Sequence, residues 1–308
     1  MLTIAVAVFA LTSLCAAERD VVNEAADMIE TRYVLEETAA QTATALRAMS
    51  SEATAAKKCA PPADFAAAFT KDLRKASGDG HFYIEHTTGE KDDWLATWRE
   101  SGRRNAYGVT RVEIFKGNIG YIRIESFHEL ENAFPRYAAA FELIADTNGL
   151  ILDLRGNGGG SPQTAWPMQW TFLEPGSPSL LKIESRAELG AEREEAPVLW
   201  KRYGRERPLA ILIDDRTFSA PEAIAYSLQS VKRATVIGEP SAGGAHMLDD
   251  GAVIGGRFKL YIPTSRPVST ITGGNWEGVG VTPDIAASKE NALETALDFM
   301  REQTEDTR

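Results

Sequence analysis

The chain of 308 residues is poor in the residues that usually bind metals: it has two cysteines and four histidines. These are not arranged as CxxC or HExxH, so no metal site is expected. The net charge is −11, and no basic run offsets it. Binding to nucleic acid or to an anionic membrane is therefore not expected. Neither a Walker-type phosphate loop nor a GxGxxG motif is present, so no cofactor is expected.

Long apolar runs are also missing, except at the N-terminus. Residues 2–14 are mostly apolar and are followed by Cys15, Ala16 and Ala17. The run is shorter than the roughly 20 residues of a membrane-spanning helix, and it predicts a signal peptide over residues 1–17, cleaved after Ala17. A membrane anchor and a lipid on Cys15 are the alternatives. Cleavage would give a periplasmic or secreted protein without a membrane span.

Removal of residues 1–17 has a consequence for the cysteines. It would take Cys15 away and leave Cys59 alone, so the mature chain is expected to have no internal disulfide, even in an oxidising compartment. Its stability would have to come from the hydrophobic core.

Periodicity divides the remaining chain into two parts. Residues 20–46 and 64–76 have helical spacing, which predicts an N-terminal helical domain over residues 18–108. From residue 109 the pattern changes to two alternating strands around Lys116-Gly117-Asn118, a hairpin signal, and then to alternating helices and buried strands. This predicts an α/β domain over residues 109–308. No flexible linker or fixed-period repeat interrupts it.

The most informative stretch of the α/β domain is PLAILIDDRTFSAPEAIAYSLQSVKRATVIGE, residues 208–239. Its five apolar residues 209–213 predict a strand buried on both faces, and a helical pattern begins near Pro221. Ser219 lies at the junction, next to the free N–H groups of a helix N-terminus. There it can act as a nucleophile. Alternatively, Ser219 is only the N-cap of the helix.

A second predicted strand, residues 149–154, ends in the glycine-rich sequence RGNGGG, residues 155–160. Glycines without Cβ atoms let backbone N–H groups approach a ligand closely. If Ser219 is a nucleophile, the oxyanion donors are expected to be the N–H of Ala220 and that of Gly158 or Gly159.

Several motifs occur together in a specific order: GYIRIESF, GLILDLRGNGGG, TFSAPEA, RATVIGEPSAGGAH and GVGVTPDI. In this order they resemble the C-terminal-processing, or tail-specific, serine peptidase family. The resemblance covers about residues 117–285, with a looser match at SGDGHF. It implies a core of stacked strand–strand–helix units similar to the ClpP/crotonase fold, with Ser219 as the nucleophile.

Two departures from the processing enzymes indicate a different branch of the family. The chain has no room for a PDZ domain before residue 109, and Gly244 occupies the expected place of the lysine base. It is more similar to the tricorn core and to the modules of interphotoreceptor retinoid-binding protein, a pattern that makes His81 the base. Tricorn-like enzymes have a serine just before this histidine, whereas here it is Gly80.

The same branch implies Glu277 as the carboxylate that orients the histidine. Glu239 and Asp153 are alternatives, and His246, which follows a glycine-rich loop, is the alternative base. His86 and His128 lie in ordinary polar contexts.

An exported serine peptidase that cleaves peptides or protein tails is the leading hypothesis, with an imidazole base suited to accept and return the proton. A non-catalytic module that binds an apolar ligand is the rival. An acyl-CoA enzyme of the crotonase type conflicts with export. The sequence leaves the oligomeric state open.

Overall fold

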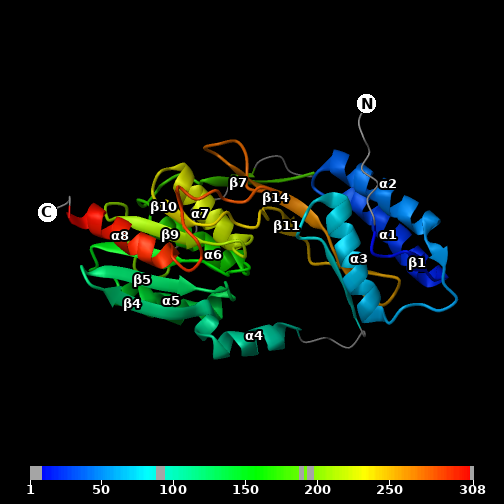
Figure 1. Ribbon diagram of the computed structural model, residues 1–308, viewed down its shortest axis with the longest axis horizontal. Helices are drawn as coiled ribbons and strands as arrows, with labels where there is room; N and C mark the ends of the chain where they lie inside the picture. The colour runs from blue at the N-terminus through cyan, green and yellow to red at the C-terminus, as the bar shows by residue number, and fades with distance from the viewer. Residues whose placement is uncertain (1–8, 88–93, 187–190, 193–197, 306–308) are drawn as a thin grey trace. The chain divides into compact units, whose positions relative to one another are not determined.

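The computed structural model describes residues 9–87, 94–186, 191–192 and 198–305 (Figure 1). The chain forms two compact units. The first comprises residues 1–92, 183–191 and 246–267, and the second comprises residues 93–182, 192–245 and 268–308. Residues 93–108, which the predicted division places in the N-terminal domain, group with the second unit. The reason is that α4 (Trp94–Arg104) packs there: the Trp98 ring stacks on His128 with 4.1 Å between ring centroids.

Three helices, α1 (Ala16–Arg32), α2 (Glu36–Glu52) and α3 (Pro62–Ser77), build most of the first unit. Each places apolar side chains at helical spacing toward a common core. The N-terminus of α3 has proline in its first turn, where the missing N–H is not needed, and Gly78 ends the helix with φ 73°. The fully buried members of this core include Val22, Ile29, Leu46, Phe69 and Leu73.

Strands complete the first unit, which is therefore not purely helical. β3 (Tyr83–His86), β13 (Phe258–Tyr261) and β12 (Ala252–Ile254) form an antiparallel sheet in which Ile84 pairs with Leu260. β1 (Ser13–Leu14) pairs in parallel with β2 (Thr54–Ala55). The strands β11 (Met247–Leu248), β14 (Pro263–Ser269), β7 (Leu181–Ser185) and β8 (Ala191–Glu192) make a further sheet in that order; most of its residues, but not residues 181–182, 192 and 268–269, belong to the first unit.

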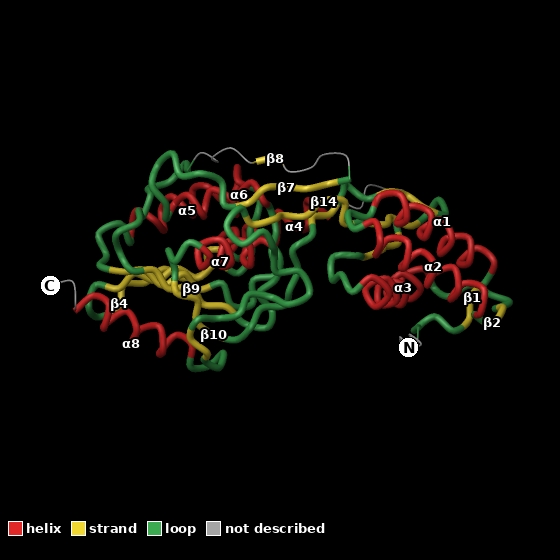
Figure 2. Tube along the Cα trace, turned by 90° about the horizontal axis from the view of Figure 1, so that it is seen from above, coloured by secondary structure: helices red, strands yellow, loops and turns green. Residues whose placement is uncertain are grey.

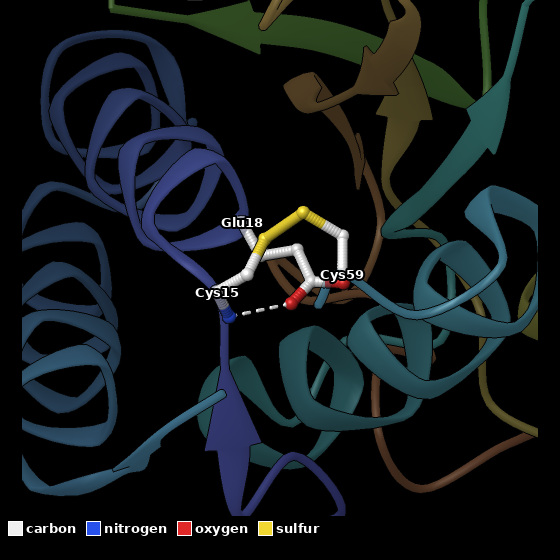
Figure 3. A group of neighbouring side chains, drawn as sticks. All are labelled: Cys15, Glu18 and Cys59. Carbon is white, nitrogen blue, oxygen red and sulfur yellow. Dashed lines mark hydrogen bonds between the residues drawn. A yellow bond between two sulfur atoms is a disulfide. The ribbon is translucent and has the colours of Figure 1, made fainter. Parts of the chain in front are cut away.

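A disulfide joins Cys15 to Cys59, across a sequence separation of 44 (Figure 3). The side chain of Glu18 lies beside it, and its carboxylate accepts the Cys15 N–H at 2.8 Å. The expectation of no internal disulfide is therefore wrong. Cleavage after Ala17 is incompatible with this bond because it removes Cys15. The prediction is wrong because it rests on local hydropathy, which does not show that Leu14 and Cys15 are buried in the first unit. Residues 1–8 of the predicted leader lie outside the described residues.

A six-stranded sheet forms the centre of the second unit, in the order β15-β10-β9-β6-β5-β4. Its strands are β4 (Val109–Phe115), β5 (Ile119–Ile124), β6 (Gly149–Asp153), β9 (Leu209–Ile213), β10 (Thr235–Gly238) and β15 (Ile285–Ala286). β4 pairs antiparallel with β5, as the hairpin signal predicted, and the other pairings are parallel.

Helices cover both faces of this sheet. Figure 2 shows α8 (Ala292–Glu305) on one side of the strands and α5 (Leu130–Leu143) and α6 (Pro162–Thr171) on the other, where α7 (Ala220–Ser230) also packs. In β9, Leu209, Ile211 and Ile213 face the core with α7, whereas Ala210 and Leu212 face the core with α8. This two-sided burial explains the uninterrupted apolar run of residues 209–213.

The parallel strands deliver three loops to one edge of the sheet. The glycine-rich residues 155–160 follow β6, the turn before Ser219 follows β9, and residues 241–244 follow β10. In open α/β sheets the carboxyl ends of the strands are where ligands bind. The candidate site of the second unit is at this edge.

Candidate active site

Ser219 lies between the end of β9 and the start of α7. Its backbone has φ 69° and ψ −115°. Side-chain-bearing residues rarely adopt this region, at a cost of about 1–3 kcal/mol, and such strain concentrates at functional sites. A sharp strand-to-helix turn of this kind presents the nucleophile in α/β-hydrolases. Ala220 follows as the first residue of α7, so no carbonyl of the helix can accept its N–H.

The carboxylate of Glu222, which is fully buried, holds this turn in place. Its Oε2 accepts the N–H of Ser219 at 2.6 Å and that of Gly244 at 2.9 Å. Its Oε1 accepts the Ser241 hydroxyl at 2.6 Å and the Gly243 N–H at 2.7 Å. Burial raises the pKa of Glu222 above its ordinary value, although these four donors act in the opposite direction. Glu222 thus connects the backbone of Ser219 to the loop after β10.

The glycine-rich loop approaches Ser219 directly. A Cβ added at Gly159, where φ is 105°, would lie 3.2 Å from the Ser219 Cβ and 3.1 Å from the Phe218 carbonyl oxygen. The Gly159 N–H donates to the side-chain oxygen of Asn157 at 2.9 Å, and the Asn157 carbonyl accepts the Phe218 N–H at 3.0 Å. Gly158 is exposed, and a Cβ there would meet nothing within 4 Å. The loop therefore needs glycine at 159 for space and backbone conformation.

Asp214, at the end of β9, connects the same loop to the turn before Ser219. Its buried carboxylate accepts the Gly156 N–H at 2.7 Å and the Arg216 N–H at 3.1 Å, and it pairs with the Lys289 ammonium at 2.8 Å. Burial opposes ionisation of Asp214, but the hydrogen bonds to Lys289, Gly156 and Arg216 outweigh it and lower its pKa.

Glu277 belongs to the second unit, as Ser219 does. Its Oε2 accepts the Ala245 N–H at 2.6 Å, and its own N–H donates to the side chain of Asn275 at 3.0 Å. The neighbouring Trp276 is buried, and its indole N–H donates to the Gly244 carbonyl at 2.7 Å. Glu277 thus lies beside the loop after β10.

His81 and His246 belong to the first unit, where both are buried around Asp79. The His246 Nδ1 is 2.7 Å from Asp79 Oδ2, and the His81 Nδ1 is 3.5 Å from Asp79 Oδ1. The Tyr33 hydroxyl donates to Asp79 Oδ2 at 3.1 Å. The two candidate bases therefore share one carboxylate, that of Asp79. Ser219 belongs to the other unit.

The remaining candidates have other partners. Asp153 is buried in a bidentate pair with Arg155, and it accepts the Tyr121 hydroxyl at 2.7 Å. Glu239 accepts the Lys289 N–H at 3.2 Å. His86 is in β3 opposite Phe258. His128 does not lie in a polar context as expected: it is fully buried against Trp98, and burial lowers its pKa although Glu129 acts in the opposite direction.

Four residues of these clusters escaped prediction from the sequence: Asp79, Asn157, Asp214 and Glu222. For Glu222 a signal exists, because Ser219 and Glu222 have the S-x-x-E spacing of a capping box. Asp214 directly follows a buried strand, where polar residues often serve a site. The partners of Asp79 and Asn157 depend on contacts between distant segments.

Cys15, Glu18 and Cys59 bring possible metal-binding atoms within 4.8 Å of one another. The two sulfur atoms are bonded to each other, however, so as a disulfide this group does not bind a metal. Within the described residues no helix has the length and apolar character needed to cross a membrane.

The model of peptidase family S41 matches residues 118–287, more than half of the chain. The chain belongs to this family. Residues 4–108 match the N-terminal domain of peptidase S41 in eukaryotic IRBP. The resemblance drawn from the five motifs is confirmed, and the S41 match includes both Ser219 and Glu277.

Curated relatives match part of this S41 chain. The carboxy-terminal-processing protease of Bartonella bacilliformis is 31% identical over 185 residues, which are 58% of this chain and 40% of that protein. The nisin-resistance protein of Lactococcus lactis subsp. lactis is 25% identical over 252 residues, 76% of this chain and 73% of that protein. The chain spans less than half the length of the first curated relatives that it matches.

Solved structures share the fold. A putative peptidase from Parabacteroides merdae has a TM-score of 0.64 at 17% identity and covers 92% of this chain and 96% of its own. The tricorn protease has a TM-score of 0.62 at 12% identity, over 94% of this chain and 37% of tricorn. The photosystem II D1 C-terminal processing protease has a TM-score of 0.56 at 16% identity, over 92% of this chain and 96% of its own. The predicted α/β fold, with a ClpP/crotonase-like core and an N-terminal helical region, is confirmed.

Proposed function

We propose that this S41 chain is a serine peptidase that cleaves peptides or protein C-terminal tails by acyl transfer through Ser219. The observation that carries the proposal is the strained backbone conformation of Ser219, which the buried Glu222 stabilises by a hydrogen bond. Gly159 also lies close to the Cβ of Ser219. An N-cap serine needs neither the strain nor the glycine-rich loop. Both are useful for a nucleophile that must stay at one position beside an approaching carbonyl.

The oxyanion of the tetrahedral intermediate needs two donors close to the nucleophile. We assign the Ala220 N–H as the first, because it follows Ser219 and has no acceptor within its helix. We assign the Gly158 N–H as the second, because the neighbouring Gly159 N–H already donates to Asn157. Gly159 then serves to keep the loop close to Ser219.

We assign His81 as the base, His246 as the alternative, and Glu277 as a carboxylate of the site. Imidazole suits the role because it can take the serine proton and return it to the leaving amine. The support for His81 is its place in the SGDGHF motif and its buried carboxylate neighbour Asp79.

Location outside the cytoplasm is part of the proposal. The Cys15–Cys59 disulfide supports it, because structural disulfides persist in oxidising compartments. The substrate class is supported by the names of the matched relatives, several of which process carboxyl-terminal tails.

Reaction with a fluorophosphonate probe, followed by mass-spectrometric mapping of the label, tests the proposal. The parent protein is expected to carry the label on Ser219, and Ser219→Ala is expected to carry none. Peptide hydrolysis should be lost in the same variant. An unlabelled parent protein that instead binds an apolar fluorophore saturably would overturn the peptidase proposal in favour of a binding module.

A further inference from the structure

Asp79 is a buried carboxylate of the first unit with several polar neighbours. Only 1% of its surface is exposed, and both carboxylate oxygens have imidazole neighbours: Oδ2 is 2.7 Å from the His246 Nδ1, and Oδ1 is 3.5 Å from the His81 Nδ1. Oδ1 also accepts the backbone N–H of His81 at 2.8 Å. The same carboxylate thus fixes the main chain of His81 and lies beside its ring.

Local sequence explains how Asp79 reaches this position. Gly78 ends α3 in the left-handed region, and the Ser77 hydroxyl accepts the Asp79 N–H at 3.1 Å. The Asp79 side chain then caps the turn that leads to His81. Tyr33 closes the other side, with its hydroxyl 3.1 Å from Asp79 Oδ2 and its ring edge-on to His246.

The charge state of Asp79 determines which imidazole nitrogens carry protons. Burial opposes its ionisation, but hydrogen bonds with His246 and His81 outweigh it and hold the pKa of Asp79 well below the ordinary range. An ionised carboxylate only accepts hydrogen bonds, so the His246 Nδ1, 2.7 Å from Asp79, must carry the proton. The His81 Nδ1 is 3.5 Å from the same carboxylate, too far for a full hydrogen bond, but the negative charge beside it still favours a proton on this atom. The Nε2 of such a neutral ring is then the basic atom, which is the tautomer that a serine hydrolase needs.

We propose that Asp79 is the positioning residue of the catalytic imidazole, and that it holds His81 in the Nδ1–H tautomer while His246 and Tyr33 fix the other carboxylate oxygen. The inference rests on the proposed function, since it presupposes that His81 is the base. Glu277 is then not needed for this task. Its carboxylate binds the Ala245 N–H in the second unit.

Two measurements on the full chain test this role. In Ser219→Ala protein with ¹⁵N-labelled histidine, NMR at a pH where the rings are neutral should show the Nδ1–H tautomer for His81 and His246. Asp79→Asn in this background should shift both rings toward Nε2–H, since an amide group can donate to Nδ1. In the otherwise unchanged protein, Asp79→Asn should lower kcat by about 10⁴-fold with KM nearly unchanged, and Asp79→Glu should restore part of the loss.

Asp72 supplies the matched control. It is an equally buried carboxylate of the first unit, but its partners are the backbone N–H groups of Ala10 and Leu11. Asp72→Asn is expected to lower the melting temperature while leaving the imidazole tautomers and kcat of the folded protein unchanged. If Asp79 had only a structural role, Asp79→Asn would behave in the same way, with a lower melting temperature but unchanged imidazole tautomers and kcat.

The outcomes separate this inference from the proposed function. Hydrolysis that survives in Ser219→Ala overturns the function itself. If Ser219→Ala is inactive but Asp79→Asn keeps the parent kcat and tautomers, only the role of Asp79 is overturned. If His246→Ala abolishes turnover and His81→Ala does not, Asp79 serves His246 and the assignment to His81 is overturned.

Discussion

The Glu222 carboxylate accepts the backbone N–H of Ser219 at 2.6 Å, three residues from it along the chain. It also accepts hydrogen bonds from three residues of the loop after β10. One buried side chain therefore determines both the conformation of the nucleophile and the position of the loop beside it. The strain at Ser219 is offset by these hydrogen bonds, and substitutions can test the two separately.

Replacement of Ser219 should separate chemistry from backbone strain. Ser219→Ala and Ser219→Gly both remove the hydroxyl, so both should lower turnover by about six orders of magnitude. Glycine adopts positive φ without a Cβ penalty, so the glycine variant should have a free energy of unfolding about 1 kcal/mol higher than the alanine variant. Urea denaturation of both variants checks this. Equal stabilities would mean that the conformation of Ser219 carries no strain.

The neighbouring glycines of the loop should differ in their response to a methyl group. Gly159→Ala forces a Cβ to 3.2 Å from that of Ser219 at φ 105°, so it should lower probe labelling of Ser219 by about 10²-fold and reduce stability. Gly158→Ala is the control, because its Cβ would enter open space. Labelling rates and melting temperatures measure both effects. Similar losses in the two variants would contradict the close approach at Gly159.

Glu222→Gln should destabilise the second unit by roughly 3 kcal/mol. The amide keeps one oxygen but turns an NH₂ group toward donors that need an acceptor, so buried N–H groups lose their partners. Glu239→Gln, at a more exposed carboxylate, is the matched control and should change stability little. Chemical denaturation gives the free energies. A Glu222→Gln protein as stable as the parent would show that the four hydrogen bonds contribute nothing net.

The Asp214–Lys289 pair predicts a pH dependence of stability. The pKa of Asp214 is lowered in the folded protein, so its ionised form contributes stability that is complete above the pKa of the unfolded chain. This contribution is lost as the pH falls through the folded pKa. Asp214→Asn should therefore flatten the decline of the unfolding free energy below about pH 4. Asp215→Asn, at the exposed neighbouring position, controls for the loss of one carboxylate, and an equal flattening there would contradict the prediction.

Loss of the disulfide should affect the first unit. The bond closes a loop across a sequence separation of 44, for which the chain-entropy relation gives a stabilisation of about 4 kcal/mol. Cys15→Ser/Cys59→Ser should therefore lower the melting temperature of this unit, and a reductant should do the same to the parent protein. The double variant is its own control, since a reductant should not change it. A reductant without effect on the parent would contradict the presence of the bond.

The sequence predicts the central strands and the elements of the second unit well. Residues 209–213 form a strand because five apolar residues between Pro208 and Asp214 fit a position that is covered on both faces. Ser219 and the glycine-rich loop are predictable because strand ends and glycine clusters leave local signals. The Asp79–His246 pair leaves none, because its members are 167 residues apart and belong to segments with no shared motif. The disulfide is not predictable for a similar reason: the apolar run of residues 2–14 indicates a leader, and the partner of Cys15 is 44 residues away.

Glu18 has a consequence for how the disulfide forms. Its Oε2 accepts the Cys15 N–H at 2.8 Å (Figure 3), and its Oε1 accepts the Ala60 N–H at 2.7 Å. One carboxylate therefore joins the two chain segments without using sulfur. When both cysteines are thiols, these hydrogen bonds still keep the segments together, and each thiol has a high effective concentration at the other. Oxidation within one chain should then outpace cross-linking between chains. A chain that folds before it meets an oxidant can thus form the disulfide afterwards, without becoming linked to a second chain.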